Sequence, residues 1–223
     1  MSIRSIRKYV VGVTTLTLLA SIVGSGCQRP EGAAAPVATT SKPPAAAGDL
    51  PPVATNEMVE DLIYKQWSAF PPGTSVVRRT TTRNAKVKNP TISHTTIRLL
   101  EKTDDYLVIE EQTRTERSSG EVVQHEPMKF RYARMIPLPP NIRKEDWGKP
   151  QGIREQGTEE VEVLGKTLRC TYMKYTSATE VGEMQCTIWV SPEIPGGLVK
   201  SYSYVPTADE TTTIEIEQVT IPR

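Results

Sequence analysis

Apolar and polar residues alternate along much of the chain. Large apolar side chains alternate with cations in Met128–Tyr132 and with acids in Ile214–Glu217, and Glu160–Val163 repeats the pattern. A period of two places one set of side chains on a buried face and the other in solvent, which is typical of a strand. Turn sequences rich in Gly, Pro, Asp and Ser separate the runs. They are Thr103–Asp105, Ser118–Gly120, Leu164–Gly165 and Pro195–Gly197.

One segment before these strands has a helical pattern instead. Asn56 is a plausible N-cap, and Met58, Leu62 and Trp67 form the apolar side of a helix that Pro71–Gly73 ends. The fold class predicted from the whole pattern is mainly β. We expect one antiparallel curved sheet or half-barrel of about eight or nine strands, with one N-terminal helix.

The first 27 residues have the layout of an export signal. Arg4, Arg7 and Lys8 precede an uncharged apolar run, Tyr9–Val23, and small residues follow it up to Cys27. A membrane-spanning helix needs roughly 20 predominantly apolar residues, and this run contains several Thr and Ser residues. We therefore expect 1–27 to be a cleaved signal rather than an anchor.

Cys27 and the small residues before it resemble the lipidation box of bacterial lipoproteins. Gly24 departs from that pattern, because the family prefers an aliphatic residue there. The resemblance implies that Cys27 carries acyl chains that hold the protein on a membrane, and Gln28 favours the outer membrane. Simple cleavage after Gly26, leaving a free thiol, and an uncleaved anchor are the alternatives.

The composition changes after the cysteine. Residues 28–55 are rich in Ala and Pro and lack aromatic side chains. Such a segment buries too little apolar area to offset the loss of chain entropy, so we expect a disordered tether. Residues 56–223 are then a single mostly-β domain, long enough for a core of its own. The net charge of +1 leaves no basic excess for nucleic acid.

The other two cysteines suggest a register for one hairpin. If Cys170 faces Cys186, then Leu168 faces Ile188 and Tyr172 faces Met184, and apolar side chains share one face. An exported protein reaches an oxidising compartment, which permits a disulfide. We therefore predict a Cys170–Cys186 disulfide, with two buried free thiols as the alternative.

Residues that carry chemistry are sparse in this sequence. His94 and His125 fall in predicted strands and lack the spacing of a metal site, so no metal ion and no cofactor are expected. The acid pairs are Asp104–Asp105, Glu110–Glu111 and Glu159–Glu160. Neighbouring residues of a strand point to opposite faces, so none of these pairs faces itself across a cleft as glycoside hydrolysis needs.

The segment Trp189–Lys200 combines a strand, a turn rich in Pro and Gly, and another strand. Together with Val161–Lys166 it resembles the late hairpins of lipoprotein-carrier-like half-barrel proteins of the cell envelope. The resemblance implies a curved antiparallel sheet around a helix, and in several such proteins the concave side holds lipid or an acylated partner.

These features lead to a functional hypothesis with two alternatives. We expect a non-catalytic, membrane-anchored lipoprotein of the cell envelope that faces the periplasm and binds an apolar ligand or a protein partner. The first alternative is an envelope scaffold or assembly protein, in which Trp147 and Trp189 would be exposed anchors. The second is a hydrolase that acts on envelope polymers, an idea that only the predicted location supports.

Overall fold

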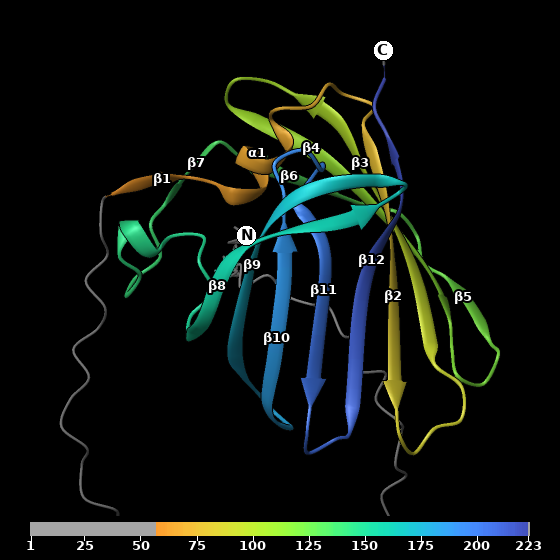
Figure 1. Ribbon diagram of the computed structural model, residues 1–223. Helices are drawn as coiled ribbons and strands as arrows, with labels where there is room; N and C mark the ends of the chain where they lie inside the picture. The colour runs from red at the N-terminus through yellow and green to blue at the C-terminus, as the bar shows by residue number, and fades with distance from the viewer. Residues whose placement is uncertain (1–56, 223) are drawn as a thin grey trace, which may run out of the picture. The chain divides into compact units, whose positions relative to one another are not determined.

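Strands make up most of the described chain in the computed structural model, which describes residues 57–222 (Figure 1). One short α-helix, α1 (Leu62–Trp67), and one 3-10 turn, η1 (Lys144–Asp146), interrupt them. The strands are β1 (Met58–Glu60), β2 (Ser75–Asn84), β3 (Thr91–Lys102), β4 (Tyr106–Glu116), β5 (Val122–Gln124), β6 (Met128–Ala133), β7 (Met135–Pro137), β8 (Ile153–Val163), β9 (Lys166–Thr179), β10 (Gly182–Val190), β11 (Leu198–Val205) and β12 (Glu210–Thr220). The predicted class, mainly β with one N-terminal helix, is confirmed.

Ten of these strands form one antiparallel sheet that does not close into a barrel. The strand order is β5-β4-β3-β2-β12-β11-β10-β9-β8, and β6 also pairs with β4. Neighbours along the sheet are mostly neighbours in sequence, joined by the turns that the Gly, Pro and Asp clusters predict. Two pairings depart from sequence order: β6 pairs with β4 across β5, and β2 pairs with β12, which joins the early strands to the late ones. β1 and β7 form a separate two-stranded sheet.

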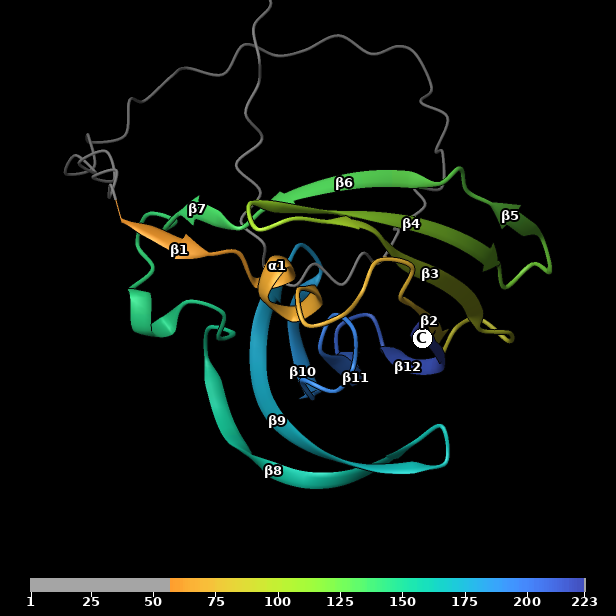
Figure 2. The ribbon, with the colours of Figure 1, turned by 90° about the horizontal axis from the view of Figure 1, so that it is seen from above.

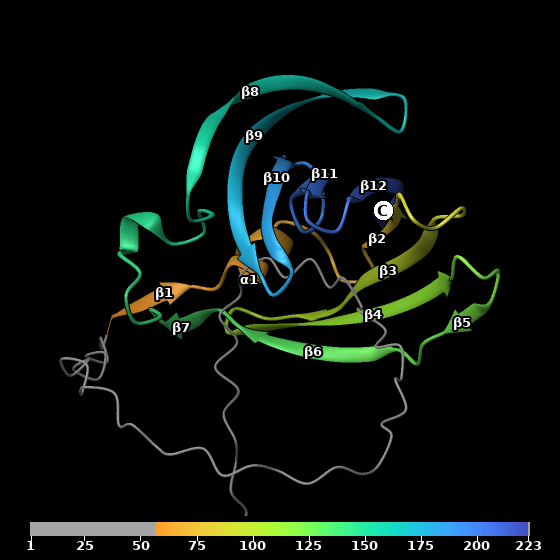
Figure 3. The same cartoon turned by 90° about the horizontal axis from the view of Figure 1, so that it is seen from below.

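The sheet bends strongly, so that β3, β4 and β6 lie on one side of β10–β12 while β8 and β9 lie on the other (Figures 2 and 3). Helix α1 lies on the first of these sides, between β6 and β10. We call the sheet face toward α1 the inner face. Alternation assigns Val76, Arg78, Thr80 and Thr82 of β2 to it, because Val76 packs against the helix.

The helix begins later than predicted. Its N-cap is Asp61, whose carboxylate accepts a hydrogen bond of 2.9 Å from the backbone N–H of Tyr64. The expected first turn is instead strand β1, because Val59 pairs with Ile136 of β7. A tertiary partner that lies far along the chain thus overrides the local helical pattern.

The predicted Cys170–Cys186 disulfide is wrong, since both thiols are free and buried. The two-residue turn between Thr179 and Gly182 sets the register of the β9–β10 hairpin, and Cys186 lies opposite Tyr175. Cys170 is five residues from that position, and an odd offset puts two side chains on opposite faces of a strand. Burial raises the pKa of both thiols, so they stay protonated.

Cys170 has a packing role in the second apolar cluster of the domain. It contacts Leu168, Ile194 and Val199, so the cluster joins the β8–β9 hairpin to β11 and the loop that precedes it. Cys27 and the predicted tether lie outside the described residues. The predicted boundaries at residues 27 and 55 therefore stay predictions.

Candidate functional site: the inner face of the sheet

One half of the inner face is apolar and covered by α1. Tyr64 and Trp67 of the helix pack on Val76, Leu99 and a row of further apolar side chains of β3 and β4. Leu99 is 0% exposed and Trp67 is 2% exposed, so this half is filled by the protein's own side chains. At about 25 cal/mol per Å² of buried apolar surface, such packing is the main source of the domain's stability.

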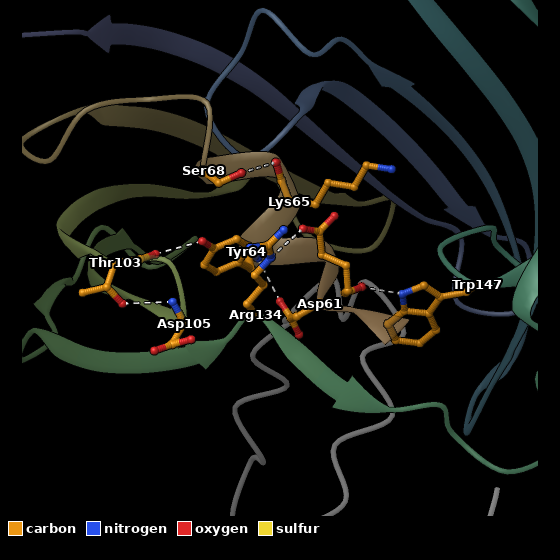
Figure 4. A network of polar contacts seen from close by, with 9 residues as sticks. Asp61, Tyr64, Lys65, Ser68, Thr103, Asp105, Arg134 and Trp147 are labelled. Carbon is orange, nitrogen blue, oxygen red and sulfur yellow. Dashed lines mark hydrogen bonds and ion pairs between the residues drawn. The ribbon is translucent and has the colours of Figure 1, made fainter. Parts of the chain in front are cut away.

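Hydrogen bonds fix the helix on this half (Figure 4). The Tyr64 hydroxyl donates to the carbonyl of Thr103 at 2.8 Å, which ties α1 to the β3–β4 turn. The backbone N–H of Asp61 donates to the carbonyl of Arg134 at 2.8 Å. Burial raises the pKa of Asp61 although backbone N–H groups of Tyr64 and Ile63 stabilise its ionised form. The helix is therefore tied to the β3–β4 turn and, through its N-cap, to the residue between β6 and β7.

The other half of the inner face carries mainly hydroxyl groups, with Ile214 between Thr80 and Ser201. Three cross-strand pairs join hydroxyls across β4, β3, β2 and β12: Thr95 with Thr113 at 3.0 Å, Ser93 with Thr115 at 3.0 Å, and Thr82 with Thr212 at 3.2 Å. The register adds Thr80, Thr91, Ser201 and Ser203 to the same face. We call these ten residues the hydroxyl patch.

The hydroxyl patch is partly open to solvent. The members on β2, β3 and β4 are half-buried, whereas Ser201, Ser203 and Thr212 near the middle of the sheet are buried. The four steps from β4 to β11 span about 19 Å, because neighbouring strands lie about 4.8 Å apart. Among the members on the described strands, the Ser201 hydroxyl is buried without a hydrogen-bond partner.

Two charged residues stand where the apolar half meets the hydroxyl patch. Arg78 of β2 lies opposite Thr95 of β3, and Glu111 of β4 lies opposite Ile97. Burial lowers the pKa of Arg78 to about 10, and the charge of Glu111 opposes this effect. Burial also raises the pKa of Glu111, with Arg78 opposing. Each group thus weakens the other's burial penalty without removing it.

Tyr132 of β6 shares this boundary. Its pKa is raised to about 12, chiefly by burial and next by the charge of Glu111. The phenol therefore stays protonated at neutral pH, so Arg78 and Glu111 carry the charge of this region.

The residues singled out by sequence do not gather at the boundary. His94 lies on the outer face, where its Nδ1 lies 2.7 Å from the Glu217 carboxylate. His125 is exposed in a loop after β5 rather than in a strand. Residues 57–222 contain no group of three His, Cys, Asp or Glu side chains arranged for a metal ion. Glu110 and Glu111 point to opposite faces as predicted, with Glu110 facing Lys129 and Glu111 facing inward, whereas Asp104 and Asp105 lie in the turn between β3 and β4.

The two tryptophans considered as anchors are half-buried rather than fully exposed. The indole N–H of Trp147 donates to the carbonyl of Glu60 at 2.8 Å, and that of Trp189 donates to the Glu159 carboxylate. Trp147 also lines an open cleft of about 310 Å³ with Met58 and Met135.

Comparison with known proteins finds no family for this chain and gives loose structural superpositions. The chain matches no protein-family model and no curated protein. A candidate exported protein with a YmcC-like fold from Bacteroides fragilis NCTC 9343 superimposes with a TM-score of 0.40 at 13% identity, over 68% of this chain and 97% of that one. A candidate lipoprotein from Parabacteroides distasonis ATCC 8503 superimposes with a TM-score of 0.38 at 17% identity, over 68% of this chain and 97% of that one. Lipoprotein LppX of Mycobacterium tuberculosis superimposes with a TM-score of 0.38 at 11% identity, over 68% of this chain and 88% of that one.

These similar structures come from exported proteins and lipoproteins. The superpositions are too loose to transfer a residue or an activity. Within residues 57–222, no helix has the length and apolarity needed to cross a membrane. The function is therefore argued from this chain's own residues.

Proposed function

We propose that the chain is a non-catalytic binding protein of the bacterial cell envelope, anchored through Cys27, that receives its ligand on the hydroxyl patch. The observation that carries this proposal is the division of the inner face. The apolar half is filled by Tyr64 and Trp67, whereas the hydroxyls on β2, β3 and β4 remain half-buried and accessible. Accessible polar groups that share one face can fix the orientation of a polar ligand.

This geometry favours a polar ligand over an apolar one. An apolar ligand on the half covered by α1 would have to displace the helix, which is held by Tyr64, Asp61 and the core beneath it. A polar ligand on the hydroxyl patch needs no such displacement.

The carboxyl groups support a non-catalytic role. Two carboxyl groups among the described residues have a clearly raised pKa, Asp61 and Glu111. Asp61 caps α1, which leaves Glu111 alone beside the hydroxyl patch. Cleavage of a glycosidic bond ordinarily requires two facing carboxyl groups.

The proposal is tested by photo-crosslinking in cells that make the protein. A photoreactive amino acid replaces Ser93 on the inner face or, as the matched control, Ile92 on the outer face. We expect an adduct at position 93 that is absent at position 92. Equal adducts at both positions, or none at position 93, would exclude the inner face as the binding site.

The anchor is tested by fractionation. Replacing Cys27 with serine should move the protein from the membrane fraction to the soluble fraction, because the variant lacks the acylated thiol. If the variant stays on the membrane, the anchor at Cys27 is wrong.

A further inference from the structure

Arg78 lies at the inner end of the hydroxyl patch with hydrogen-bonding capacity left over. A guanidinium carries five N–H donors in a fixed fork. The Nε atom of Arg78 is buried and has no hydrogen-bond partner among the described residues. A buried donor without a partner destabilises the folded protein, more so when it is charged. The protein therefore leaves one donor of this guanidinium unsatisfied.

The surroundings of Arg78 orient the guanidinium without satisfying it. A Cβ atom added to Gly196 would lie 2.9 Å from Nη2 of Arg78 and 2.9 Å from Nε1 of Trp67. The guanidinium is thus packed against the loop before β11 and the last residue of α1. Its directly opposite neighbour is Thr95, whose hydroxyl is bonded to Thr113.

Glu111 provides an incomplete counter-charge. Its carboxyl group is half-buried, and burial raises its pKa. The carboxylate therefore pays a desolvation cost of its own, and it does not satisfy the Nε donor of Arg78. A ligand oxyanion that reached the guanidinium would gain a charge-assisted hydrogen bond that the protein alone does not form.

We propose that Arg78 binds the anionic group of an acidic sugar, whose hydroxyls contact the hydroxyl patch. Ser and Thr hydroxyls both donate and accept hydrogen bonds, so a row of them complements a ligand that is rich in hydroxyls itself. The patch adjoins one guanidinium, which suits one carboxylate or phosphate per binding position. This inference rests on the proposed function, because it names the class of ligand for the same face.

Calorimetric titration of the purified protein tests the proposal with defined probes. The probes are trigalacturonate, galactotriose as the neutral counterpart, and galactose 6-phosphate, which tells a phosphate from a carboxylate. We expect trigalacturonate or galactose 6-phosphate to bind at least tenfold more tightly than the neutral sugar. Equal affinity for the acidic and neutral sugars, or no binding of either acidic sugar at millimolar concentration, would overturn the proposal.

Matched variants assign the effect to the inner face. Arg78→Gln should lose at least tenfold in affinity for the acidic sugar, and Arg78→Lys should fall between it and wild type, because lysine keeps the charge without the fork. Arg79→Gln changes the next residue, which lies exposed on the outer face, and should bind like wild type. Thr95→Val should lower the affinity for acidic and neutral sugars alike, whereas Thr96→Val on the outer face should leave both affinities unchanged.

Arg78 could instead only clamp the loop at Gly196 to α1. In that case Arg78→Gln lowers the melting temperature and leaves the affinity for the acidic sugar unchanged, which overturns the proposal. If Arg78→Gln does not fold, the Arg78 Nε–H signal of the wild-type protein decides by nuclear magnetic resonance. It should shift on titration with the acidic sugar, and an unmoved signal overturns the proposal.

The two proposals fail in different ways. An adduct at position 93 without any preference for acidic sugars would support the inner face as the binding site and exclude an acidic sugar as its ligand. The absence of an adduct at that position would exclude both the inner face as the binding site and the acidic sugar as its ligand.

Discussion

The two halves of the inner face are built on the same strands and differ in what covers them. On β2, Val76 lies under α1 and is fully buried, whereas Thr80 and Thr82 lie beyond the helix and are half-buried. On β3 the sequence changes in the same way from Leu99 to Ser93. The sheet therefore provides shape in both halves, and the short helix decides which half is a core and which half is a surface.

Loss of apolar volume should separate the halves most strongly. We expect Leu99→Ala to lower the free energy of unfolding by about 2–5 kcal/mol, because the side chain is completely buried beneath α1. Thr113→Ala on the hydroxyl patch should cost about 1 kcal/mol or less, since it removes one hydrogen bond at a half-buried position. Urea unfolding followed by circular dichroism measures both. Similar losses would mean that the patch is as much a core as the covered half.

Gly196 connects the covered half to Arg78, and a methyl group there should be costly. Its φ is +73°, and the added Cβ would meet Arg78 and Trp67. We expect Gly196→Ala to lose about 2–4 kcal/mol from backbone strain and overpacking together. Gly165→Ala is the control, because its φ is +72° with no atom within 4 Å of the new Cβ, and it should lose about 1 kcal/mol. Equal losses for the two variants would show that Gly196 is not sterically confined.

The cap of α1 should have a smaller effect on the covered half. Asp61→Ala removes the hydrogen bond to the Tyr64 N–H and should cost about 1 kcal/mol. Asp61→Asn keeps a capping group and removes a carboxylate whose pKa burial has raised, so it should be at least as stable as wild type at pH 8. Thermal unfolding of the three proteins at pH 8 measures the difference. An asparagine variant as unstable as the alanine variant would mean that the charge itself holds the helix.

Glu111 should give the smallest effect, a pH dependence at the boundary between the halves. Its pKa is raised above 4.5 in the folded protein, so its contribution to stability is complete below the unfolded pKa and is lost as pH rises through the folded one. Relative to Glu111→Gln, wild type should therefore lose stability as pH increases from 4.5 to 8. Arg78 and Tyr132 share the boundary in both proteins, and Asp61 titrates in both. A flat difference across this range would contradict the assigned pKa shift.

Alternation along the strands was sufficient to predict the fold class, while Gly, Pro, Asp and Ser clusters predicted the main turns and a helical spacing of apolar residues predicted the short helix, though not its start. Glu215 and Glu217 alternate with Ile214 and Ile216, so one face of β12 is marked plainly. The β9–β10 register was not predictable in the same way. Tyr172, Met173 and Tyr175 place apolar rings or chains on both faces of β9, so an incorrect offset also produced a plausible apolar set.

The candidate site was missed for a related reason. Arg78 stands in a segment where Val, Arg and Thr come as doublets and a triplet, so no period of two shows which of the two arginines points inward. Arg78 points inward because it lies two residues from Val76, which packs beneath α1, and the local sequence does not show that contact. Threonine-rich strands predict β structure but do not indicate which hydroxyls share a concave face. A deliberate count of Ser and Thr at every second position could have found the patch.

The pairing of β2 with β12 has a consequence for the order of folding. Glu210 lies opposite Asn84 and Thr220 lies opposite Ser75. The first long strand of the sheet therefore cannot complete its pairing until the last strand is present. The hairpins β3–β4 and β9–β10 need only nearby residues and can form early, whereas this seam closes a very long loop and is expected to form late. For a chain that is exported as predicted, two half-sheets with unpaired edges would then await the arrival of the C-terminal strand on the far side of the membrane.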